Sequence, residues 1–219
     1  MSAGRLSSRS GAAVLFVVAG LASAGCTHSV EGTATAAPVT AVPETAEELE
    51  ALVVREVPSG LPRLPDHELD PPAGAKTVED VAGYADDPER EREVLEDYGY
   101  RFGWERFWGQ GEGALTSVFV DQFERRAGAG AYAEDLARND AEHYRGMLRE
   151  SPADLPRTCR SLTLDDPDAD LGLDGPAAFA WCAHGVFSVA VTVVAESVDA
   201  AEAEMRDVVA RQLDRLPPR

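Results

Sequence analysis

A regular alternation of aromatic and polar side chains runs through residues 100–108, written YRFGWERFW. Four aromatic residues share one parity: Tyr100, Phe102, Trp104 and Trp108. Arg106 interrupts them. A period of two is typical of a β-strand, because successive side chains point to opposite faces of a sheet. The glycine-rich residues 109–113 separate this strand from a second β-rich run at 115–123, so the two runs predict a hairpin.

A second pair of β-rich runs lies in the C-terminal third of the chain. Residues 177–184 and 185–196 predict another hairpin. Its last strand alternates clearly, with four apolar residues on one face: Phe187, Val189, Val191 and Val193. A short run at 158–164 predicts one further strand. The pattern therefore predicts an antiparallel sheet of about five strands in two hairpins.

Helical segments lie on either side of these hairpins. Asp87 and Pro88 begin a charged helix, because proline is tolerated in the first turn. Residues 127–147 predict a second helix, and residues 199–216 predict an amphipathic third. We expect an α+β fold in which the sheet packs against two or three helices, and we expect the helices at 127–147 and 199–216 to cover the same aromatic face of the first strand.

The first 25 residues have the pattern of an export signal. Arg5 and Arg9 form a positive segment without acidic residues, and the apolar run at 11–21 is too short to cross a bilayer. Residues 21–26, LASAGC, resemble the lipobox of bacterial lipoproteins. The resemblance implies that Cys26 is diacylated on its sulfur and becomes the first residue of the mature chain. We expect the protein to be anchored by lipid on the extracytoplasmic face of the cell membrane.

The lipobox resemblance leaves one alternative. Ser23 stands where the lipobox usually has leucine, so ordinary signal-peptidase cleavage next to Ala24 would give a chain without a lipid.

Composition divides the chain into four segments. Thr45 and Glu48 form a capping box for a short helix, and prolines between residues 58 and 72 prevent regular structure. This proline-rich stretch is either a second linker or a loop draped on the domain. The expected layout is a signal peptide at 1–25, a disordered tether at 26–44, a short helix and linker at 45–75, and a compact α+β domain at 76–219.

The charge balance excludes one class of partner. The chain has 20 basic and 39 acidic residues, a formal net charge of −19, and Lys76 is its only lysine. Nucleic-acid binding is not expected, because phosphate recognition depends on clustered Lys and Arg. Anionic lipid also repels such a surface, so acyl chains rather than charge must hold the protein at a membrane.

Two cysteines remain when Cys26 is set aside. Cys159 and Cys182 form an even pair in a chain that we expect to be exported, so we predict a disulfide between them. The chain-entropy model assigns roughly 3 kcal/mol to such a bridge. A metal site is the alternative, but it needs more ligands than two thiols.

Three motifs match known functional patterns only in part. Residues 128–133 match the G-x-G-x-x-A turn of dinucleotide-binding proteins, but no acidic strand end follows. Alternate aspartates occur as in half of an EF-hand at Asp166, Asp168 and Asp170; we interpret them as a solvated loop, with weak cation binding as the alternative. His143 and His184 are candidate general bases outside any catalytic motif. We expect neither an enzyme nor a cofactor.

The aromatic strand is the main candidate for binding. Tyr100, Phe102, Trp104 and Trp108 could stack on sugar rings or line a slot for an apolar ligand. Core packing is the alternative, because a small domain needs its large side chains inside. Exposure of the tryptophans distinguishes the two interpretations.

Several short motifs between residues 90 and 216 resemble those of a group of uncharacterised actinobacterial exported lipoproteins. The stretches that carry the resemblance are YGY at 98–100, GWERFW at 103–108, VDQF at 120–123, AGAY at 129–132, VAV at 189–191 and ARQLDRL at 210–216. The expected architecture is similar to that of PsbP-like domains and of the extracellular sensor domains of actinobacterial kinases. The resemblance implies compartment and fold more than chemistry, because the group has no established activity. From the aromatic strand and the lack of a catalytic motif, we expect a non-enzymatic binding or interaction module with an envelope partner or an apolar or carbohydrate ligand. A scaffold, or a hydrolase acting on cell wall or lipid, is the alternative.

Overall fold

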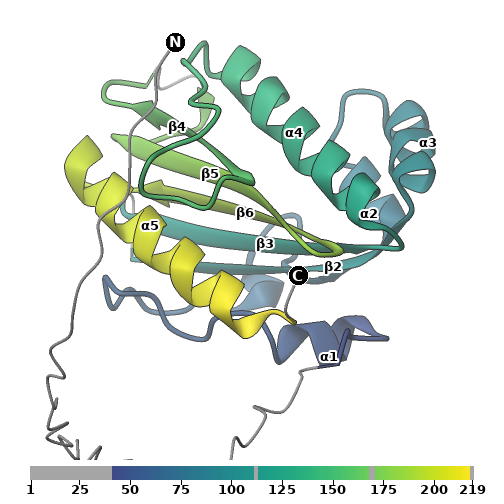
Figure 1. Cartoon of the computed structure of the whole chain (residues 1–219). Helices are drawn as coiled ribbons and strands as arrows, with labels where there is room; N and C mark the ends of the chain where they lie inside the picture. Colours follow the sequence, from purple (N-terminus) through teal and green to yellow (C-terminus); the bar gives the residue numbers. More distant parts are fainter. Residues whose placement is uncertain (1–40, 111–112, 168–170, 218–219) are drawn as a thin grey trace, which may run out of the picture. The chain divides into compact units, whose positions relative to one another are not determined.

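The alternating runs form one antiparallel sheet. The computed structural model describes residues 41–110, 113–167 and 171–217. Its six strands lie in the order β1-β2-β3-β6-β5-β4 (Figure 1). The strands are β1 (Gly74–Lys76), β2 (Tyr100–Gly109), β3 (Leu115–Phe123), β4 (Cys159–Leu164), β5 (Ala177–His184) and β6 (Phe187–Val194). The α+β prediction is confirmed, with one more strand than expected: β1 is too short to show an alternating pattern.

Five α-helices accompany the sheet within the described residues. They are α1 (Ala46–Glu50), α2 (Val78–Ala82), α3 (Pro88–Tyr98), α4 (Arg126–His143) and α5 (Val198–Arg215), with a 3-10 turn at Asp66–Glu68. Side chains of Thr45, Thr77, Asp87 and Ser197 cap four of them by accepting hydrogen bonds from backbone N–H groups. No helix in these ranges is long and apolar enough to span a bilayer.

The two long helices lie on opposite faces of the sheet. On β5, Ala178, Ala180 and Cys182 pack in one cluster with Met205 of α5. Phe179 and Trp181 pack in another cluster with Ala137 of α4. The expectation that both helices cover one face is therefore wrong. Every residue of β5 except its last, His184, is apolar, so both faces of this strand need a cover.

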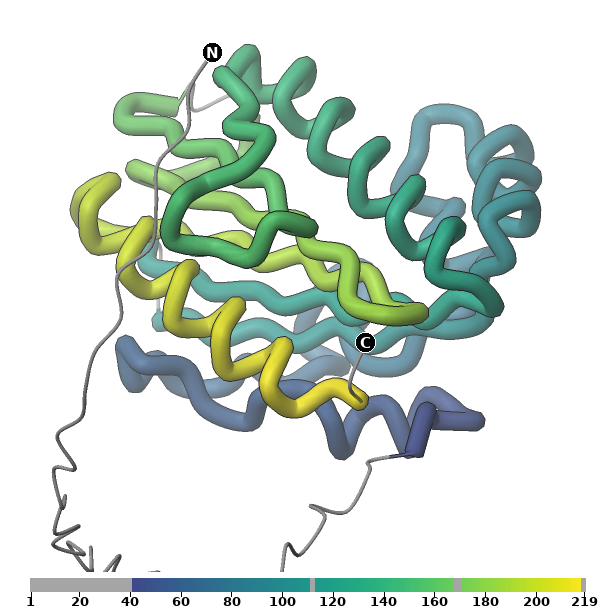
Figure 2. The backbone as a smooth tube through the Cα atoms, viewed as in Figure 1, coloured from purple at the N-terminus to yellow at the C-terminus, as the bar shows by residue number. Residues whose placement is uncertain are grey.

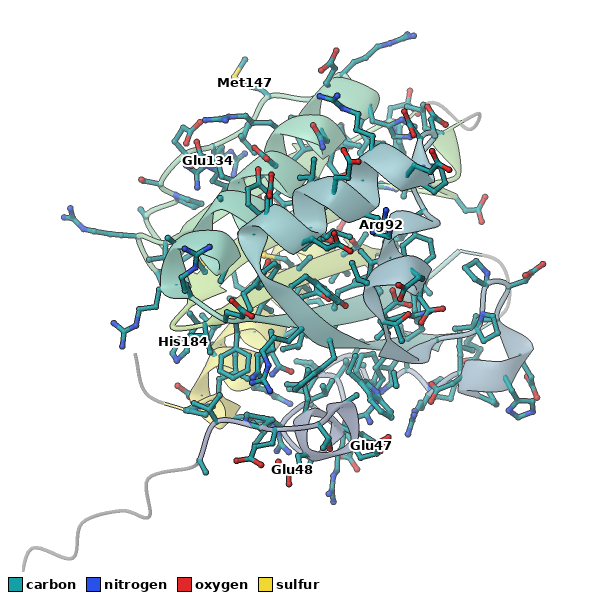
Figure 3. All side chains as sticks on the ribbon, turned by 90° about the vertical axis from the view of Figure 1, so that its right-hand side faces the viewer. Glu47, Glu48, Arg92, Glu134, Met147 and His184 are labelled. Atoms are coloured by element: carbon teal, nitrogen blue, oxygen red, sulfur yellow. A yellow bond between two sulfur atoms is a disulfide. The ribbon has the colours of Figure 1, made fainter. Side chains whose placement is uncertain are left out.

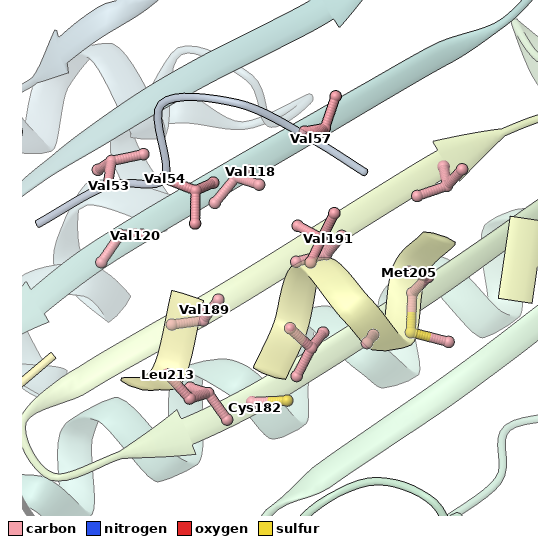
Figure 4. Close-up of a cluster of buried hydrophobic side chains, with 14 of the residues drawn as sticks. Val53, Val54, Val57, Val118, Val120, Cys182, Val189, Val191, Met205 and Leu213 are labelled. Carbon is pink, nitrogen blue, oxygen red and sulfur yellow. The ribbon is translucent and has the colours of Figure 1, made fainter. Parts of the chain in front are cut away.

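The segment before residue 58 belongs to the packed core. Val53, Val54 and Val57 lie against β3, β6 and α5 (Figure 4). Gln212 of α5 accepts a hydrogen bond from the Val54 N–H at 2.9 Å and donates one to the Leu52 carbonyl at 3.1 Å. The backbone trace shows this segment running alongside α5 (Figure 2). The core thus includes residues that precede residue 76.

Of the two alternatives for the proline-rich stretch, the structure shows the draped loop. The Leu64 N–H donates to the Phe107 carbonyl at 2.9 Å, and the Gly109 N–H donates to the Pro62 carbonyl at 3.0 Å. These bonds attach the loop to the free edge of β2.

The predicted disulfide is present. Cys159 on β4 and Cys182 on β5 lie directly opposite each other in the strand register, and both are buried. The bridge links the start of the edge strand β4 to the second hairpin.

Candidate functional site

The aromatic residues of β2 do not form a common surface. Trp104 and Trp108 are 8% and 1% exposed and pack in the core between the sheet, α5 and residues 49–57. Phe102 lies against the same core, whereas Tyr100 packs on the opposite face because the register shifts between Tyr100 and Phe102. For the tryptophans the structure shows the core-packing alternative.

A cavity of about 200 Å³ lies on the other face of the sheet, beneath α4. One side is a stripe of α4 residues spaced four apart, which places them on one helix face: Tyr132, Leu136, Asp140 and Tyr144. The floor is a row across four neighbouring strands: Glu105, Phe119, Ala190 and Trp181. Val81, Tyr84, Asp121, Phe179 and Thr192 complete the lining. We call this space the α4 cavity.

Aromatic rings form one wall of the α4 cavity. Phe179 and Trp181 stack in parallel, with ring centroids 5.7 Å apart, and Tyr144 lies 4.9 Å from Phe179. Tyr132 is 6% exposed, and its hydroxyl makes no hydrogen bond within the described ranges. Trp181 donates a hydrogen bond from Nε1 to Asp140 at 3.1 Å. The wall therefore combines apolar faces with polar edges.

Two carboxylates, those of Asp121 and Asp140, reach the α4 cavity and form no ion pair among the described residues. Asp121 is 7% exposed and accepts a hydrogen bond from the Tyr100 hydroxyl at 3.1 Å. Burial, and then the nearby charge of Glu105, raises the pKa of Asp121 to about 7. Burial also raises the pKa of Asp140 to about 6, although its bond from Trp181 and the charge of His143 act against that rise.

Gly103 makes room for the Asp121–Tyr100 pair. It lies opposite Asp121 in the register of β2 and β3. A Cβ atom on Gly103 would come within 2.2 Å of Asp121 Oδ1 and 2.7 Å of the Tyr100 hydroxyl. Only glycine lets both side chains occupy this part of the sheet.

An internal ion pair lies at the edge of the α4 cavity. Lys76 is 4% exposed, and its Nζ lies 3.1 Å from a carboxylate oxygen of Glu105 and 5.4 Å from the ring centre of Tyr84. The Tyr84 hydroxyl donates to Glu105 at 3.0 Å. Burial raises the pKa of Glu105, and the charge of Lys76 opposes this rise. Tyr84 remains 48% exposed and is shared with a neighbouring hollow of about 280 Å³.

The other sequence motifs fall elsewhere. Residues 128–133 lie inside α4, where a Cβ on Gly128 would meet the Tyr98 carbonyl oxygen at 1.8 Å; this glycine allows close packing between α4 and the end of α3. Asp168 and Asp170, like Cys26, lie outside the described residues. Within the described ranges, no group of three His, Cys, Asp or Glu side chains could hold a metal.

The two histidines lie at separate places. His184 is buried at the end of β5, where a ring nitrogen lies 2.9 Å from the Pro217 carbonyl oxygen, beside the end of α5 (Figure 3). His143 is exposed at the end of α4, with its ring against Tyr144. His184 thus contacts the carbonyl group of Pro217, and His143 contacts the ring of Tyr144.

No protein-family model matches the chain, and comparisons with curated proteins and with solved structures also found no match. We therefore infer function from the site alone.

Sequence reasoning missed the residues that define the α4 cavity. Asp121 lies within a β-rich run, and such an inward carboxylate is a signal of a built site. The stripe from Tyr132 to Tyr144 could also have been found, because its polar members repeat at helical spacing. Both signals are easily overlooked in a chain with 39 acidic residues.

Proposed function

We propose that this protein is a lipid-anchored, extracytoplasmic binding protein and that the α4 cavity holds its ligand. The observation that carries the proposal is an aromatic cavity into which Asp121 and Asp140 place carboxylates that form no ion pair among the described residues. Burying such charges opposes folding, and a protein has no structural need for them. Buried carboxylates that oppose folding in this way are typical of ligand-binding sites.

The proposed location rests on the sequence. The signal pattern before Cys26 and the pair Cys159–Cys182 both favour export, and disulfides persist outside the cytoplasm. The resemblance to actinobacterial exported lipoproteins supports the same compartment. Two acyl chains on Cys26 would hold the domain at the membrane despite its negative charge.

Filling the cavity tests the proposed function. The full chain is purified from its own membranes, and small molecules released by solvent are identified by mass spectrometry. Ala190→Leu adds apolar volume to the cavity floor, whereas Ala203→Leu adds the same volume at an exposed position of α5. We expect a released compound from wild type and Ala203→Leu, and a loss of at least about tenfold from Ala190→Leu. Equal recovery from all three, or no compound from wild type, would contradict the proposal.

A further inference from the structure

We propose that the α4 cavity binds the ammonium group of a small apolar amine. This inference rests on the proposed function and specifies the chemical class of its ligand. Three observations support it: an ammonium already bound at the edge, two acceptors inside that lack a cation, and aromatic rings around them.

The side chain of Lys76 shows how this part of the fold holds an ammonium. Its Nζ is removed from water and held by the carboxylate of Glu105, the carbonyl oxygen of Pro72 and the face of Tyr84. Glu105 and Tyr84 both line the α4 cavity. A carboxylate and an aromatic face are the two groups that stabilise a desolvated ammonium most strongly. The same pair of groups recurs farther inside.

The inner part of the α4 cavity also offers carboxylates beside aromatic rings, and there these carboxylates have no ammonium group bound to them. Asp121 and Asp140 form no ion pair among the described residues, and each accepts only the one hydrogen bond from Tyr100 or Trp181. Each carboxylate keeps acceptor capacity, since a carboxylate accepts several hydrogen bonds. The Tyr132 hydroxyl adds a third oxygen with no partner there. Three oxygen acceptors match the three N–H donors of a primary ammonium.

The aromatic wall selects for an apolar body on the amine. Tyr132, Tyr144, Phe179 and Trp181 are the rings that border the carboxylates, and they offer faces or edges to an apolar group. At about 200 Å³, the cavity is smaller than those that take drug-sized molecules. Alkyl or aryl-alkyl amines of modest size fit this description.

Other ligand charges fit the α4 cavity poorly. An anion would lie beside Asp121, Asp140 and Glu105 in a domain whose chain has a net charge of −19. A neutral ligand would leave the buried carboxylates without compensation. A protonated amine is not repelled by these carboxylates, and it compensates their negative charge.

Three probes of similar shape separate the alternatives. Isothermal titration calorimetry at pH 8 measures 2-phenylethylamine, 2-phenylethanol and 3-phenylpropanoate against the full chain in a sugar-headed, non-ionic detergent. Fluorescence of Trp181 provides a second signal, because it is the tryptophan that lines the cavity. We expect the amine to bind at least about tenfold more tightly than the alcohol and the carboxylate to bind most weakly.

Matched variants assign the effect to the two carboxylates. Asp121→Asn and Asp140→Asn should each weaken amine binding about tenfold while changing alcohol binding less than about twofold. Retained alcohol binding shows that the variant is folded with its cavity intact. Asp207→Asn removes the same charge from an exposed position on α5, on the opposite face of the sheet, and should leave amine affinity unchanged.

The outcomes distinguish the inference from the proposed function. Equal or tighter binding of the alcohol or the carboxylate, or undiminished amine binding by both Asn variants, would overturn the ammonium inference and leave a ligand-binding cavity. An absence of binding by all three probes, together with the failure of the cavity-filling test, would overturn both.

Discussion

At the scale of single residues, Asp121 is the clearest conflict between folding and function. It lies on β3 with Tyr100 and Glu105 of β2 on one side and Tyr132 of α4 on another. None of these three neighbours carries a positive charge. Among the causes that act on the pKa of Asp121, only the hydrogen bond from Tyr100 favours the ionised carboxylate. The domain therefore tolerates a carboxylate that costs stability when it ionises.

Stability should fall over the pH range in which Asp121 is ionised in the unfolded chain but still protonated in the folded protein. Its pKa of about 7 lies above its ordinary value of 3.8, so the folded state holds a proton that the unfolded state has lost between these pH values. The free energy of unfolding should therefore decrease from pH 4 to pH 7. Asp121→Asn should remove this decrease and be more stable than wild type at pH 8 by roughly 2 kcal/mol. Urea unfolding at pH 5 and pH 8 checks the result, and an equal difference at both pH values would contradict it.

Gly103 should tolerate no side chain. The Cβ of Gly103→Ala would overlap Asp121 and Tyr100, so we expect a loss of roughly 1–3 kcal/mol and weaker ligand binding. Gly130→Ala is the matched control, because a Cβ at Gly130 meets nothing within 4 Å and the residue lies inside α4. This control should gain about 0.5–1 kcal/mol. Thermal unfolding measures both changes, and similar effects would refute the steric argument.

At the scale of elements, Arg106 explains why a charged residue stands in the aromatic parity of β2. It is 2% exposed, and its guanidinium donates to the Val54 carbonyl at 2.8 Å and to Glu50 at 2.9 Å. The arginine therefore attaches α1 and the following residues to the sheet. Sequence alternation predicted the strand correctly, but it could not show that a distant segment would supply partners for an inward arginine.

Removing the guanidinium should loosen that segment. Arg106→Met keeps the apolar length but leaves the Val54 carbonyl and Glu50 without a donor, so we expect a loss of roughly 2–4 kcal/mol. Limited proteolysis should cut residues 45–57 sooner than in wild type. Arg92→Met is the control, because its ion pair with Glu96 is exposed and should contribute less than about 1 kcal/mol. Equal destabilisation by both variants would contradict this role.

At the scale of the whole molecule, periodicity predicted the hairpins and the long helices, and the even pair of cysteines in a chain expected to be exported predicted the disulfide. Periodicity did not predict which face of the sheet each long helix covers. Strands such as β5 are apolar at both odd and even positions, so their pattern gives no sign of which helix packs on which side. The α4 cavity was hidden for the same reason. It combines residues from α4, β2, β3, β5 and β6 whose proximity depends on the opposite placement of α4 and α5.

Membrane attachment is the prediction that concerns the whole chain. If acyl chains on Cys26 hold the protein, Cys26→Ser should move it from the membrane pellet to the soluble fraction, because the acidic domain is not attracted to anionic lipid. Ultracentrifugation after high-salt washing measures this distribution. Wild-type protein that incorporates no labelled palmitate, or a variant that pellets as wild type does, would contradict lipid anchoring.

Short segments of the chain pair with part of each border of the sheet. Residues 62–64 pair with β2 beyond β1, and Arg149 exchanges two backbone hydrogen bonds with Ser161 of β4. Prolines beside the first loop offer no N–H for further pairing. Copies crowded on one surface would thus find fewer unpaired backbone groups along these two stretches to extend into one another.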